Sequence, residues 1–154
     1  MKLSTRSTYG MRALVELAFA NGHGPVSATH IAHRQALSVA YLEQLLHRLK
    51  RQGLVTSIRG PRGGYLLAKP AEQITMAEVV RVLDGPANGA AGQRVRIVRG
   101  GQSSAHAQRI AHAVQHCVHE RLTASLEGIT LQDLCNEVRA EAGEPLDHRY
   151  VFHI

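Results

Sequence analysis

The 154-residue chain is poor in aromatic residues and cysteine. Aromatics make up 4% with no Trp, so aliphatic side chains have to build any core, and the abundance of Leu, Ala and Val favours helices over a β-sandwich. Cys117 and Cys135 are the two cysteines and form no C-x-x-C motif, which excludes a disulfide framework and fits the reducing cytoplasm. No apolar run approaches the length of a membrane span, and the N-terminus lacks the apolar region of a signal peptide.

Acidic residues are scarce in the first half of the chain. Residues 1–70 contain ten Lys and Arg against two acids, whereas residues 71–154 contain eight Arg against ten acids. The overall formal charge of +6 is therefore divided into +8 and −2. This asymmetry indicates a polyanionic partner for the first half, with a chance surface asymmetry as the alternative.

Hydrophobic spacing and breaker residues predict helices over 7–20, 28–35, 39–52 and 75–83. Their N-caps are predicted at Ser27, Ser38 and Thr75 for the last three. Residues 54–58 and 65–68 predict a β-hairpin around a glycine-rich loop. After a loop over 85–103, a long helix is predicted from 104 to about 126 and a last helix over 130–140. The tail, residues 143–154, ends in a segment that could pack as a short strand.

Three helices and a hairpin in the first 70 residues are the parts of a winged helix-turn-helix. The third helix is expected to enter the DNA major groove by its N-terminal end, where Ser38, Ala40, Tyr41, Glu43 and Gln44 are predicted to be exposed. Gln44 can pair bidentately with adenine and Glu43 can accept from cytosine, while the Ser38 and Tyr41 hydroxyls suit phosphates or base edges. An ordinary solvated helix surface is the alternative.

The tip of the predicted hairpin indicates DNA binding more specifically than the third helix does. Contacts are predicted at Arg59, Gly60, Pro61, Arg62 and Gly63. Glycine lets backbone N–H groups approach a phosphate, and Arg is the side chain that enters a narrow minor groove. The loop lacks the G-K-[ST] ending of a P-loop and the G-x-G-x-x-G fingerprint, so no nucleotide site is predicted.

The long helix carries an apolar stripe along one side. Because its members recur every three or four residues, they predict a helix–helix seam. They are Ala107, Ile110, Ala111, Val114, Cys117, Val118, Leu122 and Leu126. The expected architecture is mainly α: a winged helix-turn-helix domain in 1–84, a linker in 85–103, and a dimerisation helix with a C-terminal tail in 104–154.

The first 84 residues resemble the Rrf-two (Rrf2) family of transcriptional regulators. The resemblance rests on LST at 3–5, YG at 9–10, YLEQL at 41–45, GLV at 53–55 and RGPRGGYLL at 59–67, with ITL at 129–131. It implies a homodimer built on the long helix, with both wings in the minor groove. It also implies base reading by Ala40, Glu43 and Gln44, with Arg59 in the minor groove.

Iron–sulfur members of this family carry three Cys, and some a nearby His, between the fourth helix and the long helix. Residues 85–116 contain no Cys here, and a cluster needs thiolate ligands, so no iron–sulfur cluster and no other cofactor is predicted. Alignment on RLT at 121–123 places His112 at the His ligand position and Arg109 at that of the last Cys. LDGP at 83–86 and YVFHI at 150–154 are similar to a cluster-free repressor of cysteine metabolism, which implies a partner protein or a thiol as the signal.

Two further sensor hypotheses stay open. His112, His116 and His119 are spaced by three or four residues and could chelate Zn²⁺ or Ni²⁺, with a solvated helix face as the alternative. Cys117 could be a redox sensor at the dimer seam, or simply a small apolar side chain.

No enzyme is predicted, because the sequence has no nucleophile elbow, no H-E-x-x-H motif and no close carboxylate pair. The function predicted is a homodimeric, sequence-specific transcriptional regulator in the cytoplasm, a repressor that binds double-stranded DNA at a pseudo-palindromic operator. One alternative is a regulator whose signal comes from a partner protein, thiol oxidation or a His-bound metal. Another is a non-specific architectural DNA-binding protein.

Overall fold

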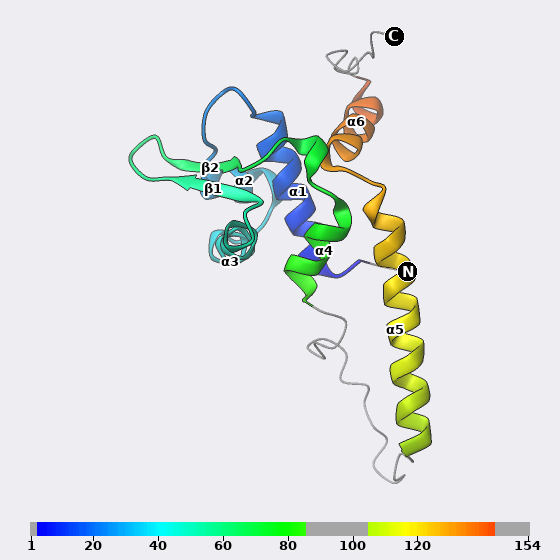
Figure 1. Cartoon of the computed structure of the whole chain (residues 1–154). Helices are drawn as coiled ribbons and strands as arrows, with labels where there is room; N and C mark the ends of the chain where they lie inside the picture. Colours follow the sequence, from blue (N-terminus) through cyan, green and yellow to red (C-terminus); the bar gives the residue numbers. More distant parts are fainter. Residues whose placement is uncertain (1–2, 86–104, 144–154) are drawn as a thin grey trace.

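The computed structural model describes residues 3–85 and 105–143, and it is mainly helical (Figure 1). In chain order the elements are α1 (Thr5–Phe19), α2 (Ala28–Gln35), α3 (Val39–Arg51), β1 (Val55–Ile58), β2 (Gly64–Leu67), the 3-10 turn η1 (Ala71–Gln73), α4 (Met76–Asp84), α5 (Ala105–Glu127) and α6 (Leu131–Ala142). Helices α1–α4 and the hairpin form a winged helix-turn-helix, and α5 stands beside it, which confirms the predicted fold class. The predicted tail strand and most of the predicted loop over 85–103 lie outside the described residues. No described helix is long and apolar enough to cross a membrane.

Side-chain caps start the helices where the sequence predicted them. Ser27, Ser38 and Thr75 each accept a hydrogen bond from the backbone N–H three residues further on. Helix α1 begins two residues earlier than predicted, at Thr5, because Ser4 supplies an equivalent cap by accepting from the Ser7 N–H at 3.0 Å. These caps satisfy backbone donors that a helix leaves unpaired at its start.

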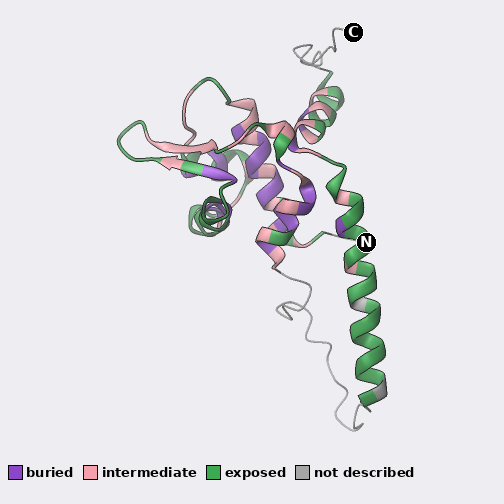
Figure 2. Ribbon diagram, viewed as in Figure 1, coloured by how far each residue is buried: buried purple, intermediate pink, exposed green. Residues whose placement is uncertain are grey.

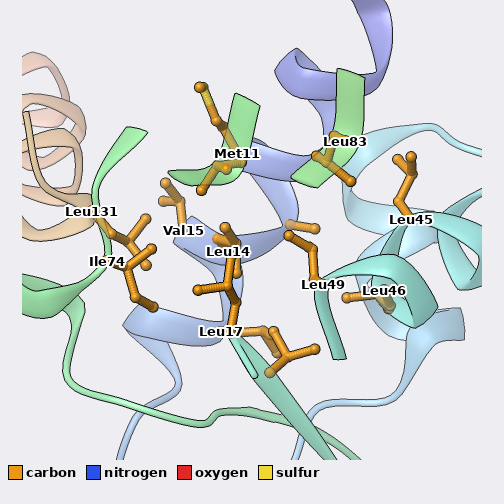
Figure 3. Packing of buried hydrophobic residues seen from close by; sticks show 14 of the residues in the cluster. Met11, Leu14, Val15, Leu17, Leu45, Leu46, Leu49, Ile74, Leu83 and Leu131 are labelled. Carbon is orange, nitrogen blue, oxygen red and sulfur yellow. The ribbon is translucent and has the colours of Figure 1, made fainter. Parts of the chain in front are cut away.

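The core is aliphatic and centres on α1. Figure 3 shows Leu14 of α1 and the leucines of α3 converging with Leu83 of α4. Leu14, Leu42, Leu46, Leu49 and Leu83 are each 0% exposed. Burying a side chain of this size contributes roughly 1.5–3 kcal/mol, so these contacts dominate the stability of the domain.

Helix α6 returns to this same core. Leu131 and Cys135 are 0% and 2% exposed within it. The backbone is joined as well, because Met76 N–H donates to the Ile129 carbonyl and Leu131 N–H donates to that of Ile74, both at 2.8 Å. Further along the helix Val138 is 38% exposed, since α6 runs on beyond the core (Figure 2).

The wing is a two-stranded antiparallel sheet tied to the segment before α2. Strand β1 pairs with β2 in a register that sets Val55 opposite Leu67. Val26 and Tyr65 exchange backbone hydrogen bonds of 3.0 and 2.8 Å, an added bridge that the sequence did not reveal. Gly64 makes this approach possible, because a Cβ at that position would lie 2.4 Å from the Val26 carbonyl oxygen.

Replacing Gly64 with alanine is therefore expected to destabilise the protein by about 2–3 kcal/mol, since a backbone clash cannot be relieved by rotating a side chain. Urea unfolding followed by circular dichroism measures this. Gly128→Ala is the matched control, because nothing lies within 4 Å of a Cβ placed there. Equal stability of the two variants would contradict the close approach.

Candidate nucleic-acid interface

Helix α3 divides cleanly into a buried and an exposed face. Leu42, Leu45, Leu46 and Leu49 are buried, and their spacing turns the intervening positions to solvent. Of the predicted DNA contacts, Ser38, Ala40, Glu43 and Gln44 are exposed at the N-terminal end of the helix. These four positions leave the N-terminal end of α3 open to solvent.

Tyr41 behaves differently from its neighbours. The prediction that it is exposed is wrong, because the side chain is half-buried against α1. Its ring meets the Tyr9 ring edge to face, with centroids 6.1 Å apart and an interplanar angle of 88°. This geometry is favourable for aromatic pairs, and it fixes the start of α3 against α1.

A polar network that the sequence did not reveal fixes the turn between α2 and α3. The Arg12 guanidinium donates to the side-chain oxygen of Gln35 at 2.7 Å and to its backbone carbonyl at 2.8 Å. The same guanidinium lies 4.9 Å from the Tyr9 ring centroid, and the Gln35 amide donates to Glu16. Ala36 follows in the left-handed conformation, with φ of 54°. Because Arg12 and Glu16 are one turn apart on α1, their spacing is the one signal in the sequence that could have suggested the network.

The tip of the wing is open to solvent. Arg59, Gly60, Pro61 and Arg62 are exposed and Gly63 is half-buried. The Gly63 N–H donates to the Gly60 carbonyl at 2.9 Å, which closes the loop into a tight turn. Figure 1 shows this hairpin extending away from the core on the α3 side of the domain.

The wing and α3 form one unit. The Lys50 ammonium donates to the Ser57 hydroxyl and so links the end of α3 to β1. Lys50, Arg51, Arg59 and Arg62 are all exposed, and no ion pair to a described residue neutralises them. Such a surface suits a phosphate backbone, to which Lys and Arg contribute salt-dependent affinity.

Helix α5 is exposed along most of its length (Figure 2), and large apolar side chains are among its exposed residues. Ile110, Val114, Val118 and Leu122 are 52%, 57%, 41% and 41% exposed, and Cys117 is exposed among them. The predicted stripe therefore exists, but within one chain nothing described covers it. At its C-terminal end the helix is joined to the core by an ion pair between Arg81 and Glu127.

The histidines of α5 lie close together. The rings of His112 and His116 are stacked with centroids 6.3 Å apart, and Nε2 of His116 is 3.9 Å from Oε1 of Glu120. His119 is half-buried. Within the described residues, no group of three or more His, Cys, Asp or Glu side chains is arranged to hold a metal ion.

The family model for Rrf2, described as an iron-dependent transcriptional regulator, matches residues 3–137. The chain belongs to the Rrf2 family. This Rrf2 chain is 37% identical over 136 residues to the HTH-type transcriptional regulator IscR of Photorhabdus laumondii, covering 88% of this chain and 80% of the relative. The resemblance drawn from the sequence is thereby confirmed.

Two solved structures are similar to this Rrf2 chain. IscR of T. potens has a TM-score of 0.68 and 34% identity, with 97% of this chain and 96% of that chain covered. CymR, the global cysteine regulator of B. subtilis, has a TM-score of 0.63 and 34% identity, with 89% and 98% covered. Both likenesses extend over the winged domain and the long helix alike.

Since the family is described as iron-dependent, the cysteines of this Rrf2 chain can be compared with what an iron–sulfur cluster needs. Cys117 is exposed on α5, while Cys135 is 2% exposed in the core. Burial raises the pKa of Cys135 to about 11, so its thiolate is scarce at neutral pH. Iron–sulfur clusters are held by several Cys thiolates, and two separated cysteines, one of them in the core, do not fit this requirement.

Arg59→Ala is expected to weaken binding to duplex DNA and to lower the slope of log K against log salt by about one, because one phosphate or groove contact is lost. Fluorescence anisotropy across a salt series measures the slope. Arg109→Ala, an exposed charge on α5, is the control and should leave the slope unchanged. An unchanged slope for Arg59→Ala would mean that the wing does not touch DNA.

Proposed function

We propose that this transcriptional regulator is a homodimeric repressor in the cytoplasm that recognises a pseudo-palindromic operator and has no catalytic role. The observation that carries the proposal is an exposed N-terminal end of α3 beside an Arg-tipped wing, with α3 and β1 linked by the hydrogen bond from Lys50 to Ser57. A helix and a hairpin fixed together can contact the major groove and the neighbouring minor groove at once. Repression then needs only that the bound protein occupies the operator.

Base reading is assigned to the exposed edge of α3. Gln44 can pair with adenine through both the oxygen and the nitrogen of its side-chain amide, Glu43 can accept from cytosine N4, and Ala40 leaves room for a thymine methyl. Ser38 keeps its hydroxyl proton available for a phosphate, because its oxygen acts as the acceptor in the helix cap. Tyr41 is assigned chiefly to holding α3 in place, since it is packed against Tyr9.

Gln44→Ala is expected to weaken operator binding by about 1–3 kcal/mol and to relax the preference at one base position in each half-site. Selection of bound sequences from a random duplex pool measures this. Gln73→Ala, an exposed residue of η1, is the control. A wild-type protein that selects no sequence over unrelated DNA would instead favour an architectural DNA-binding protein.

The homodimer is assigned to α5. Four large aliphatic side chains exposed in a row form a patch that monomeric proteins seldom leave uncovered. A second copy can cover it with the same residues across a two-fold axis, and such an axis also explains a palindromic target. Cys117 would then lie near its partner copy, so a disulfide across the seam stays a hypothesis.

Val114→Glu is expected to convert the dimer to a monomer, because it places a charge in an apolar interface. Sedimentation equilibrium at micromolar concentration measures the mass. His112→Glu is the matched control: it introduces the same charge two positions away, on the opposite side of the helix. If Val114→Glu remained dimeric, the seam would lie elsewhere.

The regulatory signal is proposed not to be an iron–sulfur cluster, because two separated cysteines supply too few thiolates. A partner protein, oxidation of Cys117 or a metal at His112 and His116 remain alternatives. The metal alternative rests only on the imidazoles of His112 and His116, one turn apart on α5 with ring centroids 6.3 Å apart.

Anaerobic reconstitution with iron and sulfide is expected to leave the protein without stoichiometric iron and without visible charge-transfer absorption. The measurement is an absorption spectrum with iron and sulfide analysis. Incorporation of a cluster that disappears in the Cys117→Ser variant would contradict the assignment.

A further inference from the structure

A cavity of about 610 Å³ lies on the side of the domain where α1 ends, between the segment that leads from β2 into η1 and helix α6. Its walls are supplied by these three parts of the chain. The lining residues that matter here are Phe19, Leu67, Ala71, Glu72, Gln132 and Arg139. Sites for small molecules commonly have volumes of roughly 300–1,000 Å³, so the cavity is large enough for a metabolite.

Arg139 of α6 supplies a positioned cation. Its guanidinium carbon lies 5.1 Å from the centroid of the Phe19 ring, and the side chain is half-buried. Stacking on an aromatic ring holds the planar group in one orientation. A guanidinium has five N–H donors, so it can serve a carboxylate and a protein partner at the same time, and a carboxylate can accept two of these donors in parallel.

Glu72 of η1 supplies the opposite charge in the same cavity, where it is half-buried. Lys69 also lines the cavity, but its ammonium is 2.9 Å from both carboxylate oxygens of Glu78 and is therefore neutralised. Arg139 and Glu72 also act on the buried Cys135 thiol: burial raises its pKa most, while Arg139 lowers the pKa and Glu72 raises it. The charges of Arg139 and Glu72 are thus both close enough to affect the same thiol.

The remaining lining is mostly polar. Asn21, His23 and Gln132 can form hydrogen bonds with a bound molecule, while Ala18, Leu67 and Ala71 leave room for a short side chain. A simple carboxylate would leave the Glu72 charge without a partner, and a multiply charged anion would be repelled by it. Because the Lys69 ammonium is paired with Glu78, the Arg139 guanidinium and the Glu72 carboxylate are the two opposite charges that remain to bind a zwitterion in this cavity.

We propose that this cavity is an effector site for a small α-amino acid, whose carboxylate binds Arg139 and whose ammonium binds Glu72. The inference rests on the proposed function, because it names the chemical class of a signal. Leu67 is the last residue of β2 and Ala68 follows it, and both line the cavity, so a bound molecule braces the strand that connects to the Arg62 tip. Binding of the amino acid in the cavity is therefore expected to change the position of the wing rather than that of α3.

The test uses the full chain with the twenty common L-amino acids as probes in thermal unfolding, followed by titration calorimetry with the one that stabilises most. At least one is expected to raise the Tm, whereas its decarboxylated amine and its deaminated acid do not. Arg139→Gln and Glu72→Gln are each expected to raise the Kd by about 10-fold or more, since each removes one charge-assisted contact. Glu137→Gln, an exposed carboxylate of α6 outside the cavity, should leave the Kd unchanged.

Absence of stabilisation by every probe, or equal binding by the two cavity variants and the wild type, would overturn the proposal. Circular dichroism of each variant shows whether it is folded. DNA binding without any amino acid is measured separately and should be the same for Glu72→Gln and wild type. A protein that binds the amino acid but no DNA would refute the proposed function while leaving the cavity assignment intact.

Discussion

The burial of α1 is the constraint on which the rest of the structure depends. This single helix packs against α2, α3, α4, α6 and β2, so it touches the helix-turn-helix, the wing and the last described helix. Gly10 brings α1 and α4 together so closely that a Cβ there would lie 2.1 Å from a methyl group of Leu83. Because α1 is shared by all these interfaces, a shift of α2, α3, α4 or α6 relative to α1 would disturb the core.

Polar and aromatic contacts fix the orientation of the helices that pack around α1. Arg12 binds the end of α2, and Tyr9 meets Tyr41 at the start of α3. Arg48 donates to the Leu83 carbonyl at 3.2 Å and so ties α3 to the end of α4. Apolar packing alone tolerates some sliding, whereas hydrogen bonds with fixed geometry do not. The recognition edge of α3 is therefore presented in one orientation.

Much of this fold could be predicted from the sequence, because the signals were local. The caps at Ser27, Ser38 and Thr75, the leucines of α3 and the glycine-rich hairpin each act over a few residues. The features that escaped prediction join distant parts of the chain. The bridge between Val26 and Tyr65 depends on chain geometry that spacing does not encode.

Tyr41 shows the same limit within the candidate site. Its position on α3 places it beside residues that are exposed, and only the presence of Tyr9 on another helix makes it half-buried. The cavity beside Arg139 could not have been found either, since its walls come from three separate segments. The sequence was enough to infer which side chains of α3 and the wing could bind DNA. Which of them are exposed, and which lie beside a cavity, could be determined only from the packed structure.

The joint between α4, α5 and α6 has a mechanical consequence. Backbone hydrogen bonds at Met76 and Leu131 hold the base of α5 firmly on the core, while the helix itself extends as a rod of about 35 Å. A tilt of about 5° at such a base displaces the far end of the rod by about 3 Å. In a pair of chains joined along their rods, the joint therefore works as a lever. Small angular changes beside Thr130 would alter the separation of the two α3 helices, and with it the match to successive turns of a duplex.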